Sequence, residues 1–275
     1  MNVGIGLPTT TPGADADLLL GWAERAEAGP FTSLAVLDRL VYDSFEPFAA
    51  LAAAAAVTER IRLATMIAIG PLRGTAELLK QAATLQVLAR GRLTLGLAVG
   101  AREDDYTAAG LSTAGRGRRL SEQLVALRGG WESSPVIPGA PPPELLVGGG
   151  SGPAFLRAAR YADGYAHGGG PPRAFARAAA GARAAWSELG RPGRPRLWGQ
   201  GYFCLGDRER GEAYLRDYYA FTGPFAETIA AAMLATPGAI RDFVRGYAEE
   251  GCDELVLLPT VSDPDELDRL AEVVG

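Results

Sequence analysis

The sequence predicts an α/β protein folded as a closed (β/α)₈ barrel, the TIM-barrel architecture, and three observations carry that prediction. Eight short runs of β-favouring residues alternate strictly with segments whose apolar residues recur at i, i+3 and i+4. Runs such as LTLGLAV and LVLL are apolar on both faces, as parallel strands covered by helices are. The 275 residues, 48% of them hydrophobic, suffice to bury the core of one such barrel. An open, doubly wound sheet is the alternative.

The first four strands read NVGIGL, SLAVL, IRLATMIAI and LTLGLAV, and each is rich in branched apolar residues. They are expected to begin near Asn2, Ser33, Ile61 and Leu93, and the helices that alternate with them cover Asp15–Ala28, Glu46–Ala56, Thr75–Leu88 and Arg116–Trp131. Gly29 stands where the first helix should stop, because glycine is favoured just past a helix C-terminus.

The last four strands are expected near Glu144, Gly164, Arg196 and Glu254, with helices over Pro153–Tyr161, Pro172–Leu189, Asp207–Ala220 and Pro237–Glu250. Asp207 precedes an acidic first turn, and Thr236 followed by proline is typical of an N-cap and first helical residue. The longest gap follows the seventh strand, where Phe221–Leu234 forms extra helix or loop in a position suited to covering a site.

Composition narrows the class of protein. The Pro-rich stretch Pro135–Pro143 is too short to be a linker, so residues 1–275 are expected to form one domain. A net charge of -5 and a pI near 5.1 argue against nucleic acid as a partner, since phosphate contacts need a basic face. Lys80 is the only lysine, which excludes a P-loop. Cys204 and Cys252 lack the spacing of zinc ligands and are expected to be buried, inert thiols. A single disulfide between them is the alternative.

Neither a membrane span nor a secretion signal is expected. The longest apolar run, Phe48–Val57, is about half of what a bilayer requires, and the N-terminus lacks the basic-then-apolar order of a signal peptide. A cytoplasmic location follows as an expectation.

Glycines crowd the point where the fifth strand turns into a helix, in LLVGGGSGP. Gly148, Gly149, Gly150, Ser151 and Gly152 would aim free N–H groups and the positive end of the helix dipole at one spot, so an anion site is predicted, most simply for a phosphate. The alternative is a tight turn in which the serine merely caps the helix. The dinucleotide fingerprint GxGxxG is absent, because no third glycine follows at the required position.

Charged residues follow the second and fourth strands. Arg102 is the better functional candidate in its loop, as a fork that could reach a phosphate or a ring carbonyl, whereas Glu103, Asp104 and Asp105 are either acid/base groups or carboxylates that favour a helix start. Arg39 could hold an anion or a cofactor ring while the preceding aspartate, Asp38, orients it. The alternative is a structural ion pair at the barrel rim.

His167 follows the sixth strand and is the only histidine, so metal sites needing several are excluded. It is the obvious proton-transfer candidate, because its ordinary pKa lies near neutrality. A structural histidine is the alternative.

The order of these motifs resembles the luciferase-like monooxygenases, a family that includes bacterial luciferase and the deazaflavin-dependent reductases. The resemblance is carried by VGIGLP, SLAVLDRLVYDSFEPFAALAAAAAVTERIRLAT, PLRGTAELLKQAATLQVLARGRLTLGLAVGAREDDYTAAG, GRGRRLSEQL and LLVGGGSGPAFLRAARYADGYAHGG. It implies a luciferase-like (β/α)₈ barrel with short insertions that binds a reduced flavin at the carboxyl ends of its strands.

Several site residues follow from the resemblance alone. The flavin phosphate would lie at Gly149, Gly150, Ser151 and Gly152, and the ribityl chain and ring would lie along Val99, Gly100 and Arg102. The family often has a non-prolyl cis peptide in the third strand, which matches the bond between Met66 and Ile67. Many members place a histidine after the second strand where this chain has Arg39, which cannot accept a proton at working pH, so His167 is left as the only histidine able to replace it.

The expected function is a flavin-dependent oxidoreductase, most simply a monooxygenase that uses reduced FMN and O₂, with Arg39 holding the ring and His167 moving a proton. A deazaflavin-dependent (F-420 type) hydride-transfer reductase is the first alternative, and a flavin-binding protein without turnover is the second. Apolar and aromatic residues in Val41–Phe48 and Phe221–Leu234 predict a small hydrophobic or aromatic organic substrate. A separate flavin reductase and a homodimer are the other expected partners.

Overall fold

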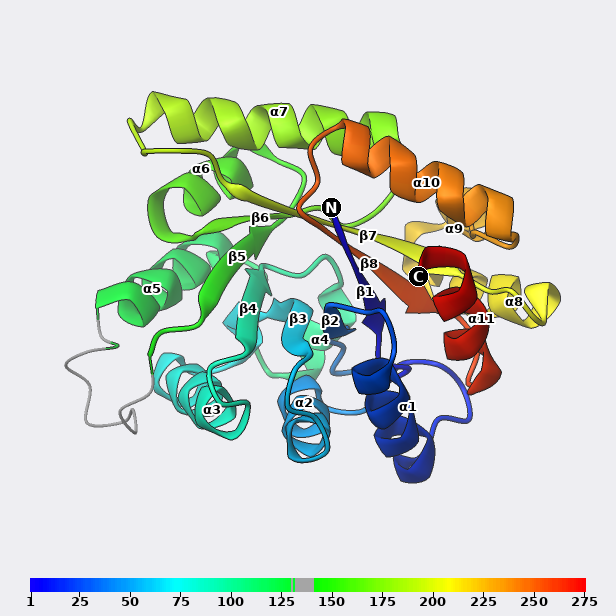
Figure 1. The fold of residues 1–275 in the computed structure, drawn as a ribbon. Coiled ribbons are helices and arrows are strands. Elements are labelled where there is room, and N and C mark those ends of the chain that lie inside the picture. Colours follow the sequence, from blue (N-terminus) through cyan, green and yellow to red (C-terminus); the bar gives the residue numbers. More distant parts are fainter. Residues whose placement is uncertain (130, 132–140) are drawn as a thin grey trace.

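Residues 1–129, 131 and 141–275 are described by a computed structural model, in which parallel strands β1 to β8 close into a barrel in chain order (Figure 1). The barrel closes between its first and last strands, where Asn2 to Ile5 pair in register with Glu254 to Leu257. This closure confirms the (β/α)₈ prediction and excludes the open, doubly wound sheet. Figure 1 shows the helices arranged around the outside of the strands.

The elements have the following bounds. The strands are β1 Asn2–Gly6, β2 Ser33–Val36, β3 Arg62–Ile69, β4 Leu93–Ala98, β5 Glu144–Gly148, β6 Gly164–Ala166, β7 Arg196–Phe203 and β8 Glu254–Pro259. The helices are α1 Ala16–Ala28, α2 Pro47–Ala56, α3 Thr75–Leu88, α4 Glu103–Ala108, α5 Arg116–Gly129, α6 Gly152–Tyr161, α7 Pro172–Glu188, α8 Arg208–Tyr218, α9 Phe225–Ala231, α10 Pro237–Glu249 and α11 Asp265–Val274. Two 3₁₀ turns, η1 Gly70–Leu72 and η2 Ala220–Thr222, complete the set for the described residues.

The predicted strands are all present, and the predicted helices match within one or two residues. Three helices are additional: α4 follows β4, α9 occupies part of the long segment after β7, and α11 follows the last strand. The sequence predicts extra helix or loop in Phe221–Leu234, and α9 forms part of that segment. The predicted helix end at Trp131 is not reached, since α5 stops at Gly129, and most of the Pro-rich stretch Pro135–Pro143 lies outside the described residues.

Side chains alternate between two apolar layers. The barrel interior is filled by small and large residues from alternating positions: Ala35, Ala64, Met66, Leu146, Ala166, Trp198, Val256 and Leu258. The intervening residues face the helices and join the larger outer core. Because the interior is closed by these side chains, only the loops at the two ends of the barrel are free to build a site.

Strand β3 is irregular near its carboxyl end. The peptide bond between Met66 and Ile67 is cis, as the resemblance predicts, and the pairing of β3 with β4 shifts register between Thr65 and Ala68. The Ile67 side chain reaches across to the neighbouring strands, where Gly96 and Gly148 leave room for it. The bulge therefore brings Ile67 to the carboxyl end of the barrel beside β5.

The amino ends of the strands carry a network of ion pairs. Arg62 and Arg196 both approach Glu144, at 3.9 and 3.4 Å. Asp253 pairs with Arg194 at 2.6 Å and lies 3.8 Å from Arg196. These residues stand at the starts of β3, β5, β7 and β8, so the network ties together strands that are distant in the chain.

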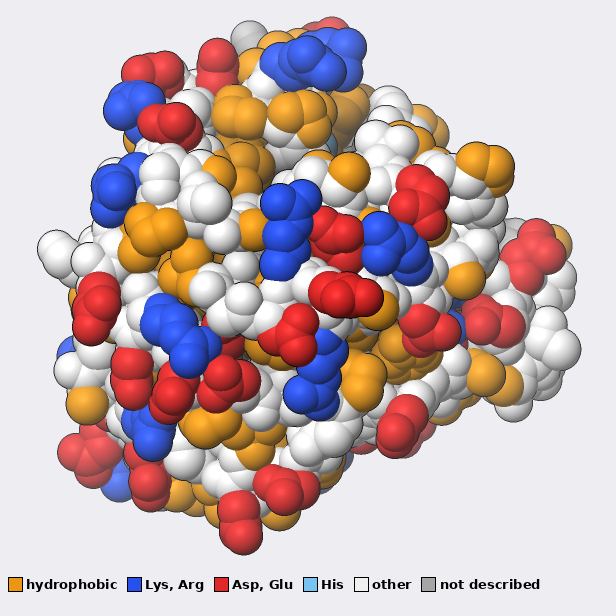
Figure 2. Space-filling view, turned by 90° about the vertical axis from the view of Figure 1, so that its right-hand side faces the viewer, with side chains coloured by type: hydrophobic (Ala, Val, Ile, Leu, Met, Phe, Trp, Pro, Cys, Tyr) orange, Lys and Arg blue, Asp and Glu red, His pale blue; other side chains and the backbone are white. Residues whose placement is uncertain are grey.

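One side of the molecule, formed partly by α8 and α9, is turned toward the viewer in Figure 2. Acidic and basic side chains are interleaved there with hydrophobic ones. Glu212 bonds both Arg208 and Arg216, and Arg216 also bonds Glu227 of α9, so opposite charges pair locally on that surface. Within the described chain, no helix has both the length and the apolar content needed to cross a membrane.

Candidate functional site

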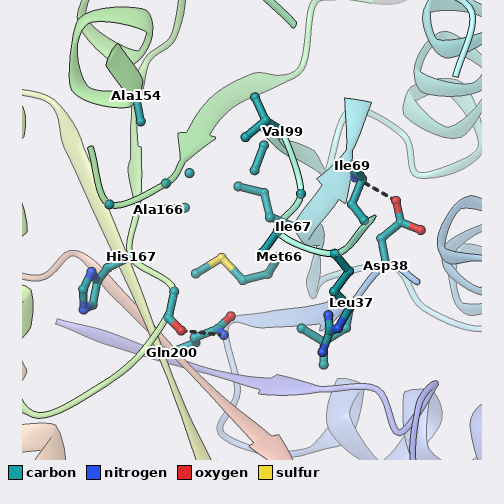
Figure 3. A pocket seen from close by; sticks show the side chains of 18 of the residues that line it. Leu37, Asp38, Met66, Ile67, Ile69, Val99, Ala154, Ala166, His167 and Gln200 are labelled. Atoms are coloured by element: carbon teal, nitrogen blue, oxygen red, sulfur yellow. Dashed lines mark hydrogen bonds between the residues drawn. The ribbon is translucent and has the colours of Figure 1, made fainter. Parts of the chain in front are cut away.

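A cavity of about 460 Å³ opens at the carboxyl ends of the strands. Its walls come from the loops after β2, β4, β5 and β6, from β3 and β7, from α4, α5 and α6, and from the end of α8 and the segment that follows it. The predicted residues Met66, Ile67, Val99, Gly100, Arg102, Gly149, Gly150, Ser151 and His167 all line it. The structure therefore brings nine of the predicted site residues to one cavity, and Figure 3 shows several of them around it.

The glycine turn after β5 forms one end of this cavity. Gly149 has φ +129°, a conformation that side-chain-bearing residues rarely adopt, and Gly148 has no space for a Cβ, because that atom would lie 2.6 Å from Ile67 Cδ1. Ser151 is the N-cap of α6, but its side chain makes no capping hydrogen bond. The Ser151 hydroxyl is thus not used as a cap, and it stands at the N-terminus of a ten-residue helix. In that helix Pro153 has no N–H, and the Ala154 N–H donates to the Ser151 carbonyl at 2.9 Å. Gly152 begins α6 and is not among the residues found to line the cavity.

Two arginines that the sequence did not single out face the same end. Arg116 opens α5 and Arg157 lies on α6, and both line the cavity. The Nη1 atom of Arg116 is buried and has no hydrogen-bond partner. The Arg157 Nε donates to Ser121 Oγ at 3.0 Å, which fixes its guanidinium. Guanidinium groups beside a glycine turn and a helix N-terminus are the donors that a phosphate prefers.

Arg102 lines the cavity from the loop after β4. Its guanidinium lies between two aromatic rings, 4.3 Å from the centroids of both Tyr218 and Phe221, and its Nη2 donates to the Tyr218 carbonyl at 2.6 Å. Its Nε is buried without a partner. Arg102 therefore holds the segment after α8 against the β4 loop, and contact with a cofactor stays a prediction.

Asp38 and Arg39 do not form the predicted pair. The Asp38 carboxylate accepts from the Ile69 N–H at 2.7 Å (Figure 3). It also accepts from Arg73 at 2.6 Å. Asp38 holds the pKa of Arg73 above its ordinary value, against the opposing effect of burial, which is the larger single influence. The prediction that Asp38 orients Arg39 is therefore wrong.

Arg39 is buried in an ion pair with α4. Its Nε lies 3.0 Å from Asp105 Oδ2 and its Nη2 lies 2.9 Å from Asp104. Asp105 is fully buried and also accepts from the N–H groups of Leu40 and Val41. This geometry confirms the ion-pair alternative, with partners from α4. Arg39 is not among the described residues that line the cavity, so its catalytic role stays a prediction.

His167 borders the cavity, but its ring turns away from Met66 and Ile67 (Figure 3). It packs edge-on against Phe175 of α7, with ring centroids 5.8 Å apart, and its Nε2 is buried without a partner. Burial lowers the pKa of His167, and a hydrogen bond with the Gly169 backbone partly offsets this. The histidine is therefore neutral at neutral pH, and proton transfer by it, which stays a prediction, would need another rotamer.

The remaining wall is aromatic and apolar. Leu37, Met66 and Phe221 line it together with two tyrosines, Tyr218 and Tyr219, and with Gln200, whose Nε2 donates to the Gly168 carbonyl at 3.2 Å. Among the two segments predicted to select the substrate, Phe221 is the residue found to line the cavity. Nowhere in the described ranges do three or more His, Cys, Asp or Glu side chains gather as a metal ion would require.

The family model of the luciferase-like monooxygenases matches residues 1–251. The chain is a luciferase-like monooxygenase family member. This agrees with the resemblance inferred from the order of its motifs. An uncharacterised protein of Mycobacterium tuberculosis (strain H37Rv) is 32% identical over 187 residues, a match that covers 54% of this chain and 65% of that relative. The match thus spans slightly less than two thirds of the relative's length.

Solved structures of other proteins share the fold of this family member. A monooxygenase from Streptomyces bottropensis, RslO1, superposes with a TM-score of 0.77 at 20% identity, covering 99% of this chain and 97% of that one. An F420-dependent secondary alcohol dehydrogenase, solved with an F420–acetone adduct, gives 0.82 at 18% identity, with 99% and 98% coverage. The oxygenating constituent of the 3,6-diketocamphane monooxygenase of Pseudomonas putida, solved with FMN, gives 0.76 at 18%, with 100% and 96% coverage.

Proposed function

We propose that this protein is a monooxygenase that binds reduced FMN and uses O₂ to oxidise a small apolar or aromatic substrate. One observation carries the proposal. The cavity has a polar end, made by the glycine turn, Ser151, Arg116 and Arg157, and an apolar and aromatic remainder. A flavin mononucleotide has the same division, with a phosphate at one end and a flat ring at the other.

The residues present fit such a group. A Cβ at Gly150 would meet no heavy atom within 4 Å, so the glycine turn leaves open space in the cavity, and the buried Arg116 Nη1 is an unpaired donor in the same cavity. A phosphomonoester carries close to two negative charges near neutral pH, and two guanidiniums face it. Met66, Ile67 and Val99 would support the ring, and Tyr218 and Phe221 would shield it from water. When bound, the reduced flavin supplies the electrons that activate O₂.

A deazaflavin-dependent hydride transferase is the second candidate. It is favoured by the likeness to the F420-dependent dehydrogenase, which covers nearly the whole of both chains. The cofactors of the two candidates differ beyond the phosphate. The FMN molecule ends at its phosphate, whereas the F420 coenzyme extends past it. For the FMN enzyme, a separate flavin reductase is the proposed source of reduced cofactor.

The test is to titrate the apoprotein with FMN, riboflavin and F420, oxidised and reduced, following absorbance and fluorescence. Charge-assisted hydrogen bonds contribute about 1.5–3 kcal/mol each, so FMN should bind at least about tenfold more tightly than riboflavin. Arg157→Ala should weaken FMN about 10–100-fold and leave riboflavin unchanged. Arg160→Ala is the matched control, since Arg160 is an exposed arginine on the same helix.

Equal affinity for FMN and riboflavin would exclude a phosphate site at the glycine turn. Preferential binding of F420, without O₂ uptake by the reduced complex, would replace the monooxygenase by the hydride transferase. Consumption of O₂ by the complex with reduced FMN is the outcome that we expect.

A further inference from the structure

Two tyrosine hydroxyls meet at the aromatic side of the cavity. The hydroxyl oxygens of Tyr202 and Tyr219 lie 2.8 Å apart. Tyr202 faces the barrel interior from the end of β7, two residues beyond Gln200, and Tyr219 comes directly after α8 and lines the cavity. The pair thus joins the rigid wall of the barrel to the segment that covers it.

One of the two hydroxyl hydrogens of Tyr202 and Tyr219 is not used in the bond between them. Each hydroxyl carries one hydrogen, and the bond between the two oxygens uses one of them. No other hydrogen bond of either hydroxyl is found among the described residues. When Tyr202 donates to Tyr219, the Tyr219 hydrogen has no partner among the described residues, and its oxygen is already held in place.

The side chains around the Tyr219 hydroxyl favour a hydrogen-bond acceptor with partial negative charge beside it. The Arg102 guanidinium carbon lies 5.6 Å from the Tyr219 ring, and its positive charge is held by Tyr218 and Phe221. Two carboxylates that line the cavity already pair with other side chains: Asp38 with Arg73, and Asp105 with Arg39. Burial raises the pKa of Tyr219, so its hydroxyl keeps its proton at neutral pH.

We propose that Tyr219 is a catalytic residue whose hydroxyl donates a hydrogen bond to an oxygen atom of the substrate, and that Tyr202 is the positioning residue that holds it. The apolar contacts of Leu37, Met66 and Phe221 would take the hydrocarbon part of the same molecule. This assignment rests on the proposed function, because it places the substrate beside the flavin ring. It gives the cavity a donor that neither Arg39 nor His167 provides in the conformation described.

The experiment uses a pair of probes that differ by one oxygen. Acetophenone and ethylbenzene have nearly the same size and shape, and only acetophenone accepts a hydrogen bond. Their dissociation constants are measured by equilibrium dialysis against the FMN-loaded protein and against the protein without FMN. The wild type should favour acetophenone over ethylbenzene, beyond their difference in water solubility, by about 3–10-fold.

Three phenylalanine variants separate the roles. Tyr219→Phe should abolish the preference for acetophenone without changing the affinity for ethylbenzene, and Tyr202→Phe should reduce it in part. Tyr214→Phe is the matched control, because Tyr214 belongs to the same aromatic cluster, bonds Thr10 and is not found to line the cavity. It should behave as the wild type.

The proposal is overturned if the wild type binds neither probe, if it does not prefer acetophenone, or if Tyr219→Phe keeps the preference. A loss of affinity for both probes equally would assign Tyr219 to packing and would also overturn it. Failure of FMN to bind, with the preference intact in the protein without FMN, would instead refute the proposed function alone.

Discussion

The ion pair between Arg39 and Asp105 makes a sharp prediction about stability. Asp105 is fully buried, it pairs with Arg39 at 3.0 Å, and it accepts two backbone N–H groups from the loop after β2. Asp104 pairs with the same arginine at 2.9 Å, but 52% of its side chain is exposed. The two aspartates are therefore matched in sequence and partner, and they differ in burial.

Removing one partner of a buried pair costs about 3–5 kcal/mol, because the remaining charge is left without solvent or counterion. An exposed pair contributes about 0.2–1 kcal/mol. Asp105→Ala should therefore lower the free energy of unfolding by about 3–5 kcal/mol, and Asp104→Ala by less than about 1 kcal/mol. At roughly 2–4 °C per kcal/mol for a chain near this size, the melting temperature should fall by about 6–20 °C in the first variant.

Urea unfolding followed by circular dichroism measures both variants, and Arg39→Leu combined with Asp105→Leu tests the cause. An apolar pair of similar volume should regain at least about half of the lost stability. Equal destabilisation by the two single alanine variants would refute the reasoning from burial. If the double variant regains stability and binds FMN but forms no product, the predicted catalytic role of Arg39 is supported.

Two further predictions concern the cavity walls. Because the folded-state pKa of His167 lies below its unfolded value near 6.5, the unfolded chain binds more protons in that window, and stability should fall as the pH drops through it. The slope should be steeper in the wild type than in His167→Gln by at most about 1.4 kcal/mol per pH unit, the value for one proton, measured by urea unfolding between about pH 5 and pH 8; equal slopes would contradict the assignment. Gly148→Ala should cost about 1–3 kcal/mol of stability, since its Cβ would lie 2.6 Å from Ile67 Cδ1. Adding Ile67→Val, which removes that atom, should restore most of the loss in the same unfolding assay, and a neutral Gly148→Ala would show that the contact is unimportant.

The sequence predicts the barrel well because each strand and most helices are defined by local periodicity. Helix α11 was missed although its apolar residues have clear helical spacing, since only segments between strands were assigned. Helix α4 has six residues, and its acidic start resembles a charged turn. Short elements of this kind carry too few periods to be recognised.

The sequence predicts the parts of the site that depend on backbone conformation. It does not predict the parts that depend on the direction in which a side chain points. The glycine turn after β5 can be recognised in the sequence, because few residues other than glycine adopt positive φ angles. Arg116 and Arg157 look like ordinary solvated charges, in a chain whose 27 basic residues are nearly all arginine. Strand β6 has three residues, too few for alternation to tell whether His167 points into the barrel or out of it. Asp105, the partner of Arg39, lies 66 residues away along the chain, and local sequence patterns do not predict contacts over that separation.

The network of charges at the starts of the strands has an evolutionary consequence. Arg62, Glu144, Arg196 and Asp253 connect four strands at the end of the barrel opposite the cavity. Substitutions in the loops around Phe221 or Tyr219 leave those contacts untouched. Selection can therefore alter which molecules are recognised at one end while the other keeps the chain folded. A protein built in this way can acquire new substrates by single substitutions, each of which lowers the free energy of unfolding only slightly.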